Sequence, residues 1–149
     1  MVVLFLFMAR MICQKTVSCY TLAMPNDCAS PLSDFARLGI ERFNNGEYWW
    51  AHEALEDAWN EEPAPIKEMY RGILQAAVVY HHVSIQNYRG AVKVYQRSQK
   101  WLNPLPDICQ GVDIARLRTD LDAAIAEVRR LGEERLDEFD LYTKIIYQE

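Results

Sequence analysis

Residues 66–85, IKEMYRGILQAAVVYHHVSI, carry apolar side chains at helical spacing over their whole length. Four of these side chains fall on one face of a helix: Met69, Ile73, Ala76 and Tyr80. Pro65 suits the first turn of such a helix, and Gly72 is the one residue inside it that commonly interrupts helices. The pattern predicts one long helix, running to about Ile85, with a buried face.

Turn signals divide the sequence on either side into four more helical segments. The expected ranges are 33–44, 48–60, 87–102 and 113–131. Ser33, Asn87 and Asp113 are of the residue types that cap helix N-termini. The first segment places its larger apolar side chains along one side: Phe35, Leu38 and Phe43. No stretch shows the strict alternation of a strand, so we predict an all-α fold.

The predicted architecture is a compact bundle of about five helices over residues 32–131. It consists of two helical hairpins, with the fifth helix packing across them. Residues 132–149 are predicted to form a weakly signalled helical tail, and residues 1–31 a disordered or mis-assigned extension. We favour Met24 as the true start, because a polar lead-in follows it. The apolar run 2–8 is too short to span a bilayer, and it lacks the positive residues that begin a signal peptide.

The four cysteines, Cys13, Cys19, Cys28 and Cys109, form no C-x-x-C pair. A chain of 149 residues can build a core without disulfides, so we predict reduced thiols and a cytoplasmic protein. The net charge of -5 argues against a nucleic-acid partner, and we expect no membrane association. A basic stripe at Arg89, Lys93, Arg97 and Lys100 is predicted to be a solvated helix face.

A helical wheel gathers six polar or aromatic side chains into a candidate site. His52, Glu56 and Trp59 share one stripe of the second segment, and Glu56 is predicted to face the core. Arg71, Gln75 and His82 share a stripe of the third segment. Two antiparallel helices joined by a short turn would bring the stripes together.

Three interpretations of this cluster are open. The favoured one is a buried polar network in which Arg71 neutralises Glu56 and Gln75 bridges them. The second is a divalent-metal site with His52, Glu56 and His82 as ligands, although Arg71 would compete for the carboxylate. The third is proton transfer between Glu56 and His52 without a metal. No cofactor is firmly implied.

The adjacent pair Trp49 and Trp50 cannot both face one core. We predict that at least one of them lies at an interface or at the mouth of a pocket. A second copy of the chain, or another protein, is the expected partner.

Residues 43–59, FNNGEYWWAHEALEDAW, and 70–78, YRGILQAAV, resemble domain-of-unknown-function family 309, over about residues 34–103. The resemblance implies a small all-helical bundle whose activity is not established. The family's recurring polar positions correspond to the six residues that the wheel selects: His52, Glu56, Trp59, Arg71, Gln75 and His82. The chain departs from the family at Gln86, where Gly is usual, and at Trp50, where Glu is common.

Two functions follow as hypotheses. The first is a structural or interaction module in which the polar cluster fixes the packing and the tryptophans supply contact surface. The alternative is a small metal-dependent hydrolase that uses the same cluster.

Overall fold

The computed structural model describes residues 28–148, and it confirms the all-α prediction. Its helices are α3 (Asp34–Asn44), α4 (Tyr48–Glu61), α5 (Lys67–Ser84), α6 (Tyr88–Leu102) and α7 (Ile114–Leu131). A short hairpin, β1 (Ile108–Cys109) and β2 (Val112–Asp113), and a 3-10 turn, η2 (Leu136–Glu138), complete it. The predicted start at Met24 and the apolar run 2–8 lie outside the described residues.

The three predicted N-caps are present. The Ala36 N–H donates to the Ser33 hydroxyl at 3.2 Å. The Gly90 N–H donates to Asn87 at 2.8 Å, and the Arg116 N–H to Asp113 at 2.9 Å. Each bond satisfies one of the backbone donors left open in a helix's first turn, which is why these helices begin where they do.

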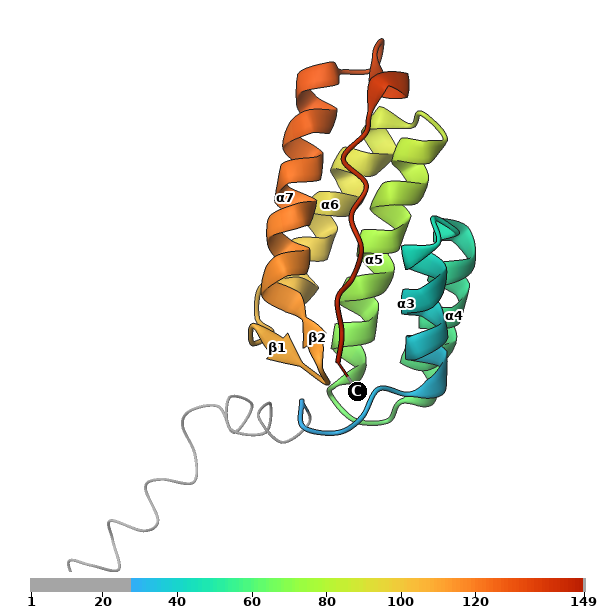
Figure 1. Cartoon of the computed structure of the whole chain (residues 1–149), viewed down its shortest axis with the longest axis vertical. Coiled ribbons are helices and arrows are strands. Elements are labelled where there is room, and N and C mark those ends of the chain that lie inside the picture. The colour runs from blue at the N-terminus through green and yellow to red at the C-terminus, as the bar shows by residue number, and fades with distance from the viewer. Residues whose placement is uncertain (1–27, 149) are drawn as a thin grey trace, which may run out of the picture.

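Helices that follow one another in the chain pack against one another, from α3 through α7 (Figure 1). Two glycines allow close approaches between neighbouring helices. A Cβ on Gly39 would lie 2.5 Å from the Leu55 side chain, and one on Gly72 would lie 2.8 Å from Leu102. Gly72 therefore lets the end of α6 lie directly on the first turns of α5.

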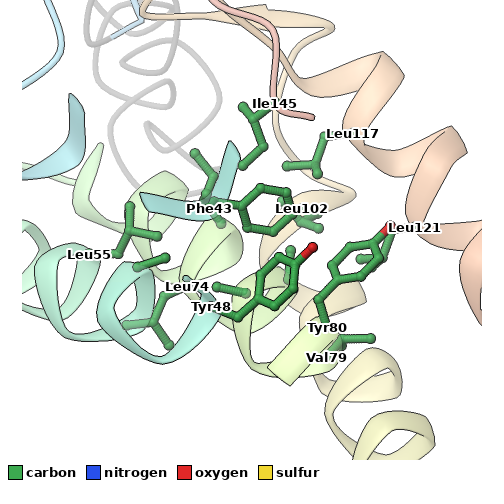
Figure 2. Close-up of a cluster of buried hydrophobic side chains, with 14 of the residues drawn as sticks. Phe43, Tyr48, Leu55, Leu74, Val79, Tyr80, Leu102, Leu117, Leu121 and Ile145 are labelled. Atoms are coloured by element: carbon green, nitrogen blue, oxygen red, sulfur yellow. The ribbon is translucent and has the colours of Figure 1, made fainter. Parts of the chain in front are cut away.

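The inner face of α5 forms the centre of the core. The predicted apolar stripe, Met69, Ile73, Ala76 and Tyr80, is fully buried. Figure 2 shows the rings of Phe43, Tyr48 and Tyr80 gathered beneath the C-terminal residues. Tyr80 meets Phe43 edge-on, with the ring centroids 5.4 Å apart. Burial raises the pKa of both tyrosines, that of Tyr48 to about 12.

The side of α3 that faces the core differs from the predicted one. Phe35 and Leu38 are exposed, whereas the smaller Ala36 and Gly39 are buried together with Phe43. Ile40 is also fully buried, so the inward face of α3 combines two large apolar residues, Ile40 and Phe43, with two small ones. Gly39 contributes to this choice because a side chain there would collide with Leu55 of α4.

The prediction of a helical tail over 132–149 is wrong for the described part of it. Gly132, at φ +71, ends α7, and after η2 the chain runs extended between α7 and α3 (Figure 1). The Asn44 side chain exchanges two hydrogen bonds with the backbone of Ile145, at 2.9 and 2.7 Å. Thr143 donates to Asp120 of α7. These hydrogen bonds and the buried Ile145 side chain hold the segment in its extended conformation.

A disulfide joins Cys28 to Cys109, so the prediction of reduced thiols is wrong for this pair. Cys13 and Cys19 lie outside the described residues. The pairing depends on the β1–β2 turn, whose Gln110 N–H donates to the Cys28 carbonyl at 2.8 Å. The two cysteines are 81 residues apart in the sequence, so no local pattern could have indicated their pairing.

None of the helices within residues 28–148 is both long and apolar enough to cross a membrane. Even α5, with 18 residues, begins with Lys67 and Glu68 and contains Arg71.

Candidate functional site

The predicted cluster lies along the seam where α4, α5 and α6 meet. Five of its six members are half-buried: His52, Trp59, Arg71, Gln75 and His82. The buried residues of α4 include Ala51, Leu55 and Ala58, each one position before a cluster residue. One position along a helix is a rotation of about 100°. The cluster therefore borders the core instead of facing it.

Glu56 is not a core residue. Its side chain is 50% exposed and lies near His52, with His52 Nε2 and Glu56 Oε2 4.0 Å apart. Exposure removes the need for a compensating cation, because water can solvate the carboxylate. The prediction that Glu56 faces the core is therefore wrong.

Arg71 pairs with Glu68 on its own helix, at 3.5 Å, instead of with Glu56. Its guanidinium carbon lies 4.1 Å from the ring centroid of Trp101 and 4.9 Å from that of Trp59. The guanidinium thus lies over one indole ring from α4 and one from α6. Arginine favours such planar contacts, because the aromatic face is electron-rich.

Two lysines extend this arrangement. Lys67 Nζ lies 6.0 Å from the Trp59 centroid, and Lys100 Nζ lies 4.5 Å from the Trp101 centroid. Each indole therefore has two cations within cation–π distance. We call the set Lys67, Trp59, Arg71, Trp101 and Lys100 the Arg71 clamp.

At the other end of the seam, the Trp49 ring contacts two histidine rings in tilted arrangements. Its ring centroid lies 5.2 Å from that of His52 and 5.3 Å from that of His81. Trp49 is nevertheless 48% exposed, and Trp50 is 58% exposed. Ile85, one turn beyond His81, is 55% exposed. We call Trp49, Trp50 and Ile85 the aromatic patch.

His82 points away from this patch, toward the start of α6. A Cβ on Gly90 would lie 2.6 Å from His82 Nδ1, so the absence of a side chain there makes room for the imidazole. Burial, and then the neighbouring His81, lower the pKa of His82 below its ordinary value. His82 therefore favours the neutral form.

Several polar atoms of the seam are buried without a protein hydrogen-bond partner within residues 28–148. They are His52 Nδ1, Trp59 Nε1, Glu68 Oε2, Gln75 Oε1 and His82 Nδ1. A structural network would pair most of these atoms with one another. The bridging role predicted for Gln75 is not seen.

Residues 36–94 match the family Domain of unknown function (DUF309). The match confirms the resemblance indicated by the sequence, and it covers α3, α4, α5 and the first half of α6. All six residues of the predicted cluster, and the whole aromatic patch, therefore lie in this matched range, which we call the DUF309 segment. Trp101 and Lys100 lie beyond it.

A relative from Aquifex aeolicus (strain VF5), described as an uncharacterized protein, is 30% identical over 87 residues. The alignment covers 56% of this chain and 25% of that protein. The chain thus matches about a quarter of the relative's length, and the relative's name indicates no activity.

The predicted metal ligands in the DUF309 segment do not form a cluster. Within residues 28–148, no group of three or more His, Cys, Asp or Glu side chains could hold a metal ion. His52 approaches Glu56, whereas His82 packs against Gly90. A divalent metal at His52, Glu56 and His82 stays a prediction without a geometric argument in its favour.

Sequence reasoning missed two features near the ends of the bundle. Trp101 lies over Arg71 because Gly72 lets α6 approach, and the spacing of 29 residues between Gly72 and Trp101 gave no local signal. A pocket of about 530 Å³ opens beside the disulfide, lined in part by Cys28, Arg37 and Gln110. It is assembled from both ends of the described chain, so no single motif indicates it.

Proposed function

We propose that this chain is a helical protein-interaction module that forms a homodimer through the aromatic patch. The observation that carries the proposal is the exposure of two adjacent indoles, Trp49 at 48% and Trp50 at 58%. Tryptophan is enriched at the energetic centres of protein interfaces, because one side chain buries a large apolar area and keeps a polar N–H.

The Trp49 side chain of the aromatic patch is also held in place by neighbouring rings. The contacts of Trp49 with His52 and His81 limit the orientations of its ring, so less side-chain entropy is lost when a partner covers it. Ile85 adds an exposed apolar side chain at the neighbouring end of α5. A second copy presents the same patch, and self-complementary contact between identical patches is the commonest form of homodimer.

Light scattering coupled to size-exclusion chromatography tests this proposal over a range of protein concentrations. We expect twice the chain mass for the unchanged protein and the monomer mass for the double variant Trp49→Ser, Trp50→Ser. Phe35→Ser is the matched control, because Phe35 is an exposed aromatic residue on another helix. A monomer at every concentration, or an unchanged dimer in the double variant, would overturn the proposal.

The cytoplasm remains the proposed location, and a core large enough to fold without disulfides supports it. The Cys28–Cys109 disulfide does not, because disulfides are rare in reducing compartments. Alkylation of free thiols in living cells, followed by mass measurement, tests the proposal. Alkylated Cys28 and Cys109 would fit a cytoplasmic protein, whereas an intact disulfide would contradict that location.

A further inference from the structure

The Arg71 clamp concentrates positive charge in a chain whose net charge is -5. Lys67, Arg71 and Lys100 lie around two indoles, and Glu68 is the acidic side chain that pairs with one of them, Arg71, within residues 28–148. Three cations against one carboxylate leave a local excess of two positive charges. Like charges held close together repel, so a bound anion would stabilise this arrangement.

The Arg71 guanidinium is held in place but leaves its donors open. The guanidinium carbon lies over the rings of Trp59 and Trp101, and an aromatic ring does not occupy the N–H donors as a carboxylate or carbonyl oxygen would. No hydrogen bond from the guanidinium is seen within residues 28–148, and the Glu68 oxygen is 3.5 Å away. The side chain is 36% exposed, so a small ligand can reach it.

This geometry suits an oxyanion with several oxygens and two charges. A fixed guanidinium can donate to two oxygens at once, and lysines add charge without a fixed direction. Trp59 also has a buried indole N–H without a protein acceptor in the described part of the chain. We propose that the Arg71 clamp binds the phosphoryl group of a small-molecule ligand.

The charge distribution favours a small ligand over a nucleic acid. A phosphate backbone needs a continuous basic surface, whereas the clamp is a single cluster on an acidic protein. Along α6, Arg89 already pairs with Glu133 at 3.0 Å, so the predicted basic stripe is partly neutralised at its far end.

The proposal is tested by titrating the full chain with inorganic phosphate at constant ionic strength, while the tryptophan indole N–H signals are followed by NMR. We expect saturable shifts of the Trp59 and Trp101 signals. Succinate, a dicarboxylate of similar charge, should bind at least about tenfold more weakly if the site prefers phosphoryl oxygens. Equal binding of succinate, or no shift of the two signals, would overturn the proposal.

Variants separate the clamp from a general charge effect. Arg71→Gln should weaken phosphate binding by about tenfold or more. Arg71→Lys should keep only part of the affinity, because lysine lacks the two parallel N–H donors of a guanidinium group. Lys100→Gln removes an exposed charge that the fold does not need, so it tests the site even if Arg71→Gln unfolds the protein. Arg89→Gln, on the same helix, is the matched control and should bind like the unchanged chain. Equal loss in Arg89→Gln and Lys100→Gln, or unchanged binding in Arg71→Gln and Lys100→Gln, would contradict the clamp.

Discussion

The two faces of α5 differ in kind although they belong to one helix. The inner face consists of fully buried residues such as Ile73 and Tyr80, and the Tyr80 ring contacts Phe43 of α3 and Tyr48 of α4. The outer face carries Arg71, Gln75 and His82, which are half-buried, and two of them have a buried polar atom without a protein partner within residues 28–148. The inner face is packed from apolar and aromatic side chains, whereas the outer face keeps buried amide and imidazole atoms that no protein group in residues 28–148 satisfies. We therefore expect substitutions on the two faces to have different effects on stability.

The largest expected effect is on the inner face. Ile73→Ala should lower the free energy of unfolding by about 2–5 kcal/mol, because it removes buried methyl groups and leaves a cavity. Urea denaturation followed by circular dichroism measures this loss. Val78→Ala is the matched control on the half-buried side, and we expect it to cost about 1 kcal/mol or less. Equal losses at the two positions would remove the distinction between the faces.

A smaller effect of opposite sign is expected at Gln75. Gln75→Leu should leave the free energy of unfolding unchanged or raise it by about 1 kcal/mol, because it removes the buried Oε1 that lacks a protein partner. The same urea titration measures it. A loss of stability greater than about 1 kcal/mol would mean that Gln75 contributes a satisfied hydrogen bond.

The smallest expected effect is a dependence on pH. The pKa of His82 is lowered in the folded protein, so the unfolded chain binds more protons below the ordinary value of 6.5. The contribution of His82 to stability is therefore complete above that value and is lost as the pH falls toward the lowered pKa. Urea midpoints at pH 7.5 and 5.5 should differ less in His82→Gln than in the unchanged protein. The same difference in both proteins would assign the effect to other groups, of which His81 is the nearest.

Local chemistry explains why most helix boundaries were predictable. Ser33, Asn87 and Asp113 cap their helices through side chains that reach only three residues along the chain, so their effect is visible in the sequence. The buried stripe of α5 was predictable for the same reason, because it depends only on helical periodicity.

The remaining features depend on contacts between distant residues. The wheel predicted that Glu56 faces the core. In the structure the core-facing residues of α4 include Ala51, Leu55 and Ala58, so Glu56 is turned by about 100° from Leu55 and water reaches its carboxylate. Trp101 as a partner of Arg71, and Cys28 as a partner of Cys109, each require the folded chain. Five of the six predicted residues border the core along the seam, and whether they form a functional site stays a prediction, whereas the predicted pairing of Arg71 with Glu56 is wrong.

The disulfide closes a covalent ring. Cys28 and Cys109 enclose the helices α3 to α6, and with them the whole DUF309 segment at 36–94. One cut by a protease in any loop of this ring leaves both pieces attached to each other until the disulfide is reduced. A cut after Cys109, in contrast, releases everything beyond it from covalent attachment. The segment inside the ring therefore stays in one covalent piece after a single cut. The segment beyond Cys109, which comprises α7 and the extended C-terminal residues, does not.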